Sequence, residues 1–217
     1  MKSILIIGMG RFGHHLCNNL IERGNQVMIV DQSEDKISDL LSVATNAQIC
    51  DCTNMEALKS LGVRNFDIVF VCIGTNFQSS LEVTSLVKEL GAKYVISKAT
   101  RDIHAKFLLR NGADEVVYPD RDIAEKLATR CSSNNVFDYI ELNDEYGIYE
   151  IPVLGEWIGK SIKDLAFRVK YGLNILGIKK GEATDLSPNA GYIFDKDDHL
   201  MVIGDKEKVG KLLKLFK

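Results

Sequence analysis

The chain opens with a short apolar run that leads directly into a glycine-rich turn. Ser3–Ile7 is followed by Gly8-Met9-Gly10-Arg11-Phe12-Gly13, and an acidic residue, Asp31, ends the next apolar run. The glycines of a GxGxxG turn let the backbone close, let it approach a pyrophosphate and let the following helix pack on the strand. A carboxylate at position 31 can hold ribose hydroxyls. Strand, turn, helix and acid at this spacing predict a Rossmann-type nucleotide-binding domain, against the alternative of a packing turn that binds nothing.

Length and charge narrow the class of protein. With 217 residues, 46% of them hydrophobic, the chain can bury one full core and a second, smaller one, so we expect two domains. The formal net charge of −3 leaves no basic surface for nucleic acid. No apolar run is long enough to span a membrane, and Met1-Lys2-Ser3 leads straight into a strand without a signal peptide. These features predict a soluble, cytoplasmic protein that does not insert into the membrane.

Short aliphatic runs alternate with amphipathic segments from Ser3 to about Cys131, as a parallel α/β sheet requires. Six strands are predicted, at Ser3–Ile7, Gln26–Val30, Ala47–Cys50, Ile68–Cys72, Tyr94–Ser97 and Glu115–Tyr118. Between them, three helical faces are expected on Phe12, Leu16, Leu20 and Ile21, on Ile37, Leu40 and Leu41, and on Leu81, Leu86, Val87 and Leu90. Glycines that favour left-handed helix exits follow at Gly24, Gly62, Gly91 and Gly112.

The polar stretch Ser132-Ser133-Asn134-Asn135 ends this alternation after a predicted helix at Ile123–Cys131. We place the domain boundary there, with the Rossmann domain over 1–133 and a smaller α+β domain over 134–217. The second domain is predicted to hold strands at Tyr139–Leu142, Tyr149–Val153, Asn174–Lys179 and His199–Ile203 and helices at about 161–169 and 206–216. A core of this size usually needs a partner surface, so we expect this domain to dimerise.

The five cysteines are an odd number with no CxxC spacing. Cys50 and Cys52 lie on one face of a predicted strand end, which leaves two interpretations open. They could form a metal or redox site, or they are buried thiols of a reduced cytosolic protein, which is the favoured interpretation.

Further motifs follow the predicted strands at their carboxyl ends. They are Asp51-Cys52-Thr53, Cys72-Ile73-Gly74-Thr75-Asn76-Phe77-Gln78, Lys98-Ala99, Gly112-Ala113-Asp114 and Tyr118-Pro119-Asp120-Arg121-Asp122, with Leu186-Ser187-Pro188 and Asp198-His199-Leu200-Met201-Val202-Ile203-Gly204 in the second domain. Together with the glycine turn and Asp31, they make essentially the whole chain resemble the regulatory RCK subunits of bacterial potassium uptake systems, of the KtrA and TrkA type. The single-repeat KtrA type is the nearer of the two.

The resemblance implies a Rossmann RCK-N domain, a dimerising RCK-C domain and a regulatory subunit that is not an enzyme. It implies that dimers assemble into a cytosolic, octameric ring beneath a membrane potassium-translocating subunit of the KtrB or TrkH type. The subunit would thus be cytoplasmic and peripheral to the inner face of the cell membrane. In that family ATP favours the active form and ADP the inactive form, and some members bind NAD(H).

The predicted nucleotide site combines backbone groups with charged side chains. Arg11 lies inside the glycine turn, where its guanidinium can reach a terminal phosphate, which favours ATP or ADP over NAD; the alternative is a solvated arginine. The charge of Asp31 would repel a 2′-phosphate and so disfavours NADP. Lys98 matches a family lysine near the phosphates, against an ordinary solvated lysine. Asp51 either borders the adenine or caps a helix around Asn54–Leu61. The full set is Gly8, Met9, Gly10, Arg11, Phe12, Gly13, Asp31, Gln32, Asp51, Cys52, Ile73, Gly74 and Lys98.

Two further sites come from the resemblance alone. Asp120 stands where family members can carry a glutamate that helps hold a divalent or sodium ion with ATP, and a simple helix-start carboxylate is the alternative. A second set reproduces the spacing associated with cyclic di-AMP binding in Ktr-type RCK-C dimers, against the alternative of an amphipathic helix packed on its sheet. This set is Ile162, Arg168, Asn174, Ile175 and Pro188.

An NAD-dependent oxidoreductase and an NAD(H)-sensing regulator are the rival functions. Hydride transfer requires a substrate cleft and a placed acid or base. The histidines offer little support for catalysis, because His14, His15, His104 and His199 are each explained as surface or interface residues. A redox-sensing repressor would need a basic recognition helix, which the sequence lacks.

Overall fold

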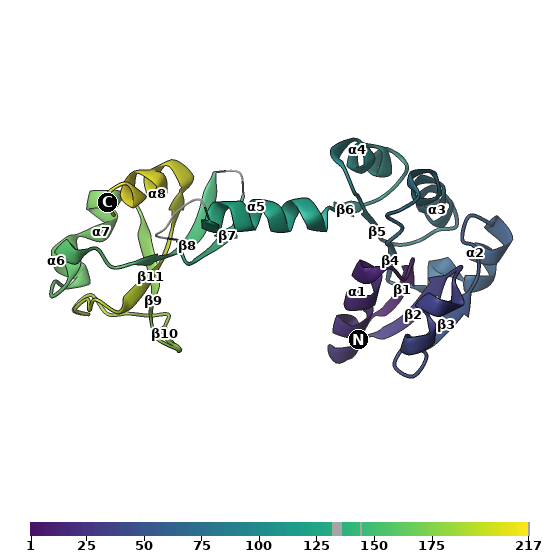
Figure 1. Cartoon of the computed structure of the whole chain (residues 1–217), viewed down its shortest axis with the longest axis horizontal. Coiled ribbons are helices and arrows are strands. Elements are labelled where there is room, and N and C mark those ends of the chain that lie inside the picture. The colour runs from purple at the N-terminus through teal and green to yellow at the C-terminus, as the bar shows by residue number, and fades with distance from the viewer. Residues whose placement is uncertain (132–135, 144, 217) are drawn as a thin grey trace. The chain divides into compact units, whose positions relative to one another are not determined.

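The computed structural model describes residues 1–131, 136–143 and 145–216. The chain divides into two compact units, Met1–Arg121 and Asp122–Lys217, each built around its own sheet (Figure 1). The predicted boundary at 132–135 lies outside the described residues. Among the helices that the structure describes, none has the length and apolar composition needed to span a lipid bilayer.

The first unit contains a six-stranded sheet in the order β3-β2-β1-β4-β5-β6, with every neighbouring pair parallel. Its strands are β1 (Ser3–Ile7), β2 (Gln26–Asp31), β3 (Asn46–Ile49), β4 (Ile68–Val71), β5 (Val95–Lys98) and β6 (Glu115–Val117). The six predicted strands are confirmed, and so is the Rossmann-type architecture. The strand order reverses direction between β1 and β4, and ligands of such sheets bind at the carboxyl ends of the strands beside this point.

Helices cover both faces of the sheet. On one face, Leu5 of β1 packs in a cluster with α2 (Met55–Leu61) and α3 (Phe77–Glu89). On the other face, Ile4 packs with α1 (Arg11–Glu22). Adjacent residues of a strand point to opposite faces, so the uninterrupted apolar run of β1 is what a strand covered on both sides requires. Beside α3, α4 (Asp102–Arg110) completes the layer with its own small cluster around Leu108.

The segment after β2 differs from the prediction. Instead of a helix with Ile37, Leu40 and Leu41 on one face, the chain makes two 3₁₀ turns, Glu34–Lys36 and Ser38–Leu40. Ile37 and Leu40 are buried as expected, whereas Leu41 is 60% exposed. The Ser38 hydroxyl donates to the Asp35 carbonyl, a local bond that competes with a regular helix.

The predicted left-handed exits are confirmed. Gly62 ends α2 with a φ of 65°, which a residue with a Cβ adopts only at a cost. The other three glycines named for this role also have positive φ, at Gly24, Gly91 and Gly112.

The second unit is smaller and antiparallel, with strand order β10-β9-β11-β8-β7. Its strands are β7 (Asp138–Glu141), β8 (Tyr146–Pro152), β9 (Asn174–Lys180), β10 (Ala183–Asp185) and β11 (Asp198–Asp205), and its helices are the greater part of α5 (Pro119–Cys131) with α6 (Ile162–Leu165), α7 (Phe167–Tyr171) and α8 (Lys206–Leu213). The short exposed strand β10 was not predicted. The single helix expected at 161–169 is broken, because Ala166 takes a left-handed φ of 43° between α6 and α7.

An aromatic cluster anchors the core of this unit. The Trp157 side chain is fully buried, and its Nε1 donates to the Tyr171 hydroxyl at 3.0 Å. Phe167 meets the indole edge to face at 5.2 Å between ring centroids. Because the buried indole N–H has this partner, the tryptophan fills the core without an unsatisfied donor.

His104 corrects the interpretation of the histidines as surface or interface residues. Its side chain lies in α4 with no exposed surface. Nδ1 accepts the Thr100 N–H at 3.4 Å, and the ring packs on Phe77 at 4.9 Å. Nε2 has no hydrogen-bond partner among the residues that the structure describes. Burial, and secondly the charge of Arg101, lower the pKa of His104, so the folded protein holds this imidazole neutral.

We therefore expect the free energy of unfolding to fall as the pH drops below about 6.5, the ordinary pKa of histidine. Below that value the unfolded chain binds a proton that folded His104 resists, with a slope of at most about 1.4 kcal/mol per pH unit for this one group. His104→Gln should flatten the dependence between pH 7 and 5 in urea titrations, whereas His15→Gln, at an exposed position of α1, should not. Identical slopes in all three proteins would contradict this assignment.

Candidate functional site

A cavity of about 630 Å³ lies at the carboxyl ends of the strands of the first unit. It is bordered by the glycine turn after β1 and by the segments that follow β2, β3, β4 and β5. The residues that line it include Gly8, Gly10, Arg11, Phe12, Asp31, Gln32, Lys36, Cys50, Asp51, Cys52, Thr53, Ile73, Gly74, Thr75, Asn76, Ser79, Lys98 and Thr100. The cavity thus occupies the place where a sheet of this topology binds its ligand.

The three glycines of the turn have different reasons to be glycine. A Cβ on Gly13 would lie 2.3 Å from the carbonyl oxygen of Gly8, and Gly8 itself has a φ of 99°. Gly13 is therefore required by the packing of α1 on the turn, and Gly8 by its left-handed backbone conformation. A Cβ on Gly10 would meet no protein atom within 4 Å, and its φ of −74° suits any residue. The fold alone does not require glycine at position 10, which leaves space beside the cavity.

The N-terminus of α1 is open toward this space. Gly10 is its N-cap, and in the described chain the first turn carries neither a side-chain cap nor an acidic residue. The first N–H groups of a helix have no partners within the helix and carry partial positive charge. A helix start of this kind beside a cavity favours an anionic ligand.

Asp31 holds the glycine turn against the end of β2. Its side chain is only 7% exposed, and Oδ2 accepts the Met9 N–H at 2.8 Å. Oδ1 accepts the Ser33 N–H at 2.9 Å and lies 3.5 Å from Nζ of Lys36. A carboxylate has about four lone-pair sites, so Oδ2 keeps capacity for a hydroxyl donor from the cavity.

Two cations at the cavity lack an acidic partner. Nζ of Lys98 lies 5.5 Å from the centre of the Phe12 ring and 3.7 Å from the position of a Cβ on Gly74. Within the described residues neither Lys98 nor Arg11 forms an ion pair, whereas Lys88 and Lys93 of the same unit pair with Asp114 and Asp67. Two uncompensated positive charges and an open helix N-terminus give the cavity a preference for polyanions.

The segment after β3 shows whether Asp51 caps α2 or borders the cavity. Asp51 accepts hydrogen bonds from the Thr53 N–H and hydroxyl at 2.9 and 2.8 Å, which lower the pKa of its carboxyl. Asn54, not Asp51, caps α2, because its side chain accepts the Glu56 N–H at 2.9 Å. The capping interpretation of Asp51 is therefore wrong, and its carboxylate borders the cavity instead.

Sequence reasoning missed several polar residues that line the cavity, among them Lys36, Ser79 and Thr100. Lys36 lies in the 3₁₀ segment that was expected to be a helix. Thr100 follows β5, where the Tyr118 hydroxyl donates to its carbonyl at 2.7 Å and its own N–H points to His104. Its place two residues after Lys98, beyond a strand end, is the signal that could have revealed it.

The structure brings most of the predicted nucleotide-site residues together. All of them line the cavity except Met9 and Gly13. The Met9 side chain is buried and its N–H donates to Asp31, while Gly13 lies in α1 against the Gly8 carbonyl. Asp120 is exposed in the first turn of α5, outside this cavity. Among the described residues no group of three or more His, Cys, Asp or Glu side chains is placed to hold a metal ion.

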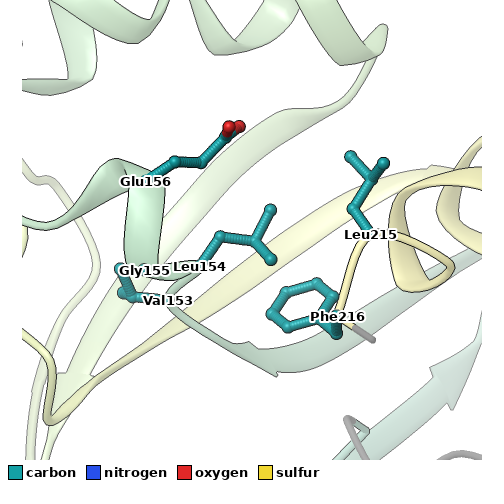
Figure 2. Close-up of a pocket in the computed structure, with 6 residues that line it drawn as sticks. All are labelled: Val153, Leu154, Gly155, Glu156, Leu215 and Phe216. Carbon is teal, nitrogen blue, oxygen red and sulfur yellow. The ribbon is translucent and has the colours of Figure 1, made fainter.

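The five residues predicted for cyclic di-AMP lie in the second unit. Ile162 and Ile175 pack at the margin of its core, Arg168 and Asn174 are exposed, and Pro188 is partly exposed. None of them lines the cavity of this unit drawn in Figure 2, where Leu154, Leu215 and Phe216 face one another.

The two glycine environments predict unequal effects on stability. Gly13→Ala should lower the free energy of unfolding by about 1–3 kcal/mol, because its methyl group would overlap the Gly8 carbonyl. Gly10→Ala should cost clearly less, at most about 1 kcal/mol, because its methyl group meets only open space and only the preference of an N-cap for glycine over alanine is lost. Denaturant titration of both variants measures the two free energies of unfolding. Equal destabilisation would contradict the open space beside Gly10.

Two known protein domains match this chain, and relatives of known name are similar to it over nearly its whole length. The TrkA-N domain matches residues 4–119 and the TrkA-C domain matches residues 148–217. The chain is 42% identical to the Ktr system potassium uptake protein C of Bacillus subtilis, over 98% of this chain and 96% of the relative. It is 40% identical to the Ktr system potassium uptake protein A of the same organism, over 96% and 94%.

Solved structures share the fold at lower identity. A GsuK channel bound to NAD superposes with a TM-score of 0.71 at 21% identity, covering 100% of this chain and 39% of that one. A GsuK channel structure gives 0.72 at 21% identity, over 99% and 39%. This chain thus spans about two fifths of those channel chains. With both domains matched in order and near-complete relatives at 40–42% identity, the chain belongs to the TrkA-N/TrkA-C family of RCK proteins, with the Ktr type among its relatives.

Proposed function

We propose that this chain is the cytoplasmic regulatory subunit of a bacterial potassium uptake system, that it senses ATP and ADP at the cavity beside the glycine turn, and that it catalyses no reaction. The names of the two Bacillus subtilis relatives support the transport role, because they match this chain over nearly its whole length. The ADP-bound and NAD-bound GsuK structures support an adenine-containing ligand for a cavity in this fold.

The observation that carries the ATP/ADP assignment is the pair of unpaired cations, Arg11 and Lys98, at a cavity that also has an open helix N-terminus. A nucleoside polyphosphate brings a charged terminal phosphate, and a guanidinium can bind it with two parallel hydrogen bonds. NAD offers no terminal phosphate, because a second sugar closes its pyrophosphate. At the other end of the site, the Asp31 carboxylate would take ribose hydroxyls.

Sensing requires a difference in affinity between two states of the protein. A ligand shifts a conformational equilibrium only by as much as it prefers one state. ATP and ADP differ by one phosphate, so the groups that meet that phosphate must supply the difference. Arg11 and Lys98 are cavity cations that form no ion pair within the described part of the chain, so they are available for this purpose. Arg11 could act on its own cavity or on that of a neighbouring subunit.

The remaining parts of the proposal concern assembly and further ligands. The subunit would form dimers that assemble into an octameric ring on a potassium-translocating membrane subunit of the KtrB or TrkH type, which holds it at the inner face of the membrane. Asp120 would contribute to a divalent or sodium ion bound with ATP. The RCK-C domain would bind cyclic di-AMP through Ile162, Arg168, Asn174, Ile175 and Pro188. Calorimetry of the full chain with cyclic di-AMP should give a saturable signal, and its absence would remove this last part.

An NAD(H)-sensing regulator is the second candidate, favoured by the NAD-bound GsuK structure. An NAD-dependent oxidoreductase has no comparable support. Thermal-shift measurements with ATP, ADP and NADH separate the candidates, since a polyphosphate sensor should be stabilised most by ATP or ADP. Consumption of NADH with any small carbonyl substrate would instead indicate an enzyme.

Replacing Arg11 tests phosphate sensing directly. Arg11→Ala should weaken ATP roughly tenfold or more, because a charge-assisted hydrogen bond is lost, and should weaken ADP less. Titration calorimetry of the full chain with each nucleotide measures both losses.

Arg23→Ala is the matched control. Arg23 lies at the other end of α1, where its guanidinium bonds the Asn19 carbonyl at 2.9 Å, so this variant should bind both nucleotides normally. Equal losses of ATP and ADP affinity in the Arg11 variant would contradict γ-phosphate sensing.

A further inference from the structure

Two cysteine side chains meet at the edge of the nucleotide cavity. The sulfur atoms of Cys50 and Cys52 are 4.0 Å apart, and both residues line the cavity. Cys50 is partly exposed, whereas Cys52 is 5% exposed. The sequence leaves open whether this pair is a metal or redox site or two buried thiols, and it favours the buried thiols. The contact between the sulfurs and the accessibility of one of them favour the redox interpretation.

The backbone on both sides of the pair is fixed. The Cys50 N–H donates to the Asp31 carbonyl at 3.1 Å, and the turn after Cys52 is held by Asp51 and Thr53. A disulfide needs the sulfurs at about 2.05 Å, so they must approach by roughly 2 Å. Side-chain rotation of the more exposed Cys50 toward Cys52 is the simplest movement that brings them together.

The other three cysteines do not share this arrangement. Cys17 and Cys72 are buried in the apolar cluster beneath α1, and burial raises the pKa of the Cys72 thiol to about 12. Cys131 is exposed near the end of α5. Structural buried thiols are inert, whereas a partly exposed thiol next to a second one can be oxidised and resolved. Disulfides of cytosolic proteins are typically transient and redox-sensing.

We propose that Cys50 and Cys52 form a redox-sensitive dithiol that closes to a disulfide when the ligand-free protein meets a low-molecular-weight disulfide, and that bound nucleotide opposes this closure. The second half rests on the proposed nucleotide function. The pair stands beside Asp51 and Asp31, at the end of the cavity assigned to the adenosine. A ligand seated there would cover Cys50, and a disulfide there would change the wall that the ligand contacts.

The chemistry balances with the small disulfide as oxidant. The Cys50 thiolate attacks one sulfur of the reagent, forming a mixed disulfide and releasing one small thiolate, which takes up a proton. The Cys52 thiol then loses its proton to solvent, and its sulfur attacks the Cys50 sulfur. The second small thiol leaves, so two protein thiols are oxidised while one reagent disulfide is reduced to two thiols. Burial raises the pKa of Cys52, which assigns the first attack to Cys50 and the resolving role to Cys52.

The experiment treats the full chain with 2-hydroxyethyl disulfide in a Cys131→Ser background, which removes the exposed competing thiol. We expect two thiols to disappear without retained reagent, and the tryptic peptide 37–59, which contains both cysteines, to carry an internal disulfide that dithiothreitol reverses. Cys52→Ser should stop at a mixed disulfide on Cys50, and Cys50→Ser should remain unmodified. Melting temperatures of the variants check that they are folded. Accumulation of the mixed disulfide on Cys50 with Cys52 present, or no reaction at all, would overturn the dithiol.

A second arm tests the link to the nucleotide. With ATP bound, as established by calorimetry on the reduced protein, closure should slow roughly tenfold or more, and the oxidised protein should bind ATP roughly tenfold more weakly. Unchanged closure with ATP bound would overturn the nucleotide half of the proposal. A reduced protein that binds no ATP, ADP or NADH would instead refute the proposed function, while closure in the ligand-free chain would still support the dithiol.

Discussion

The buried carboxylate of Asp31 connects the glycine turn with the end of β2, and the site depends on both. It accepts the Met9 N–H at 2.8 Å and so fixes the glycine turn to the end of β2. With the glycine turn held in this way, Gly13 of α1 packs directly against the Gly8 carbonyl, where no side chain fits. Because a buried acceptor without its donor costs about 1–3 kcal/mol, this one bond stabilises both the path of the turn and the position of the carboxylate.

The same arrangement supports the proposal that the cavity distinguishes ligands by charge. The open N-terminus of α1, Arg11 and Lys98 supply positive potential, while the nearest carboxylates, Asp31 and Asp51, are occupied by backbone and side-chain donors. Within the described residues, Arg11 and Lys98 therefore keep uncompensated charge, while the carboxylates of Asp31 and Asp51 already accept hydrogen bonds. In the proposed function, a nucleotide would place its phosphates toward these cations and its ribose toward Asp31.

Local periodicity was sufficient to predict the first sheet. Its central strands β1 and β4 are apolar on both faces, and a left-handed glycine precedes β2, β4, β5 and β6, so these positions follow from the sequence. The 3₁₀ segment after β2 and the break at Ala166 were not predictable in this way, because local side-chain bonds and a left-handed alanine override an amphipathic pattern. β10 was missed for a related reason: its three residues are exposed, and only pairing with β9 makes them a strand.

The site shows the same division between local and tertiary information. The glycine turn, Asp31 and Lys98 belong to motifs that the sequence shows, and residues of all three line the cavity. Thr100 and Lys36 enter it through tertiary contacts that no motif records, and the burial of His104 depends on the packing of α4. The capping role considered for Asp51 was decided by Asn54, a competing cap three residues further on that the sequence alone did not rank above it.

The most direct test of the central claim is the affinity of the full chain for adenosine, AMP, ADP and ATP, measured by titration calorimetry at one salt concentration. If the unpaired cations and the helix N-terminus recognise the phosphates, affinity should rise with each added phosphate and be highest for ATP. Equal affinities across the series, or no binding of any member, would contradict the assignment of this cavity to a nucleoside polyphosphate.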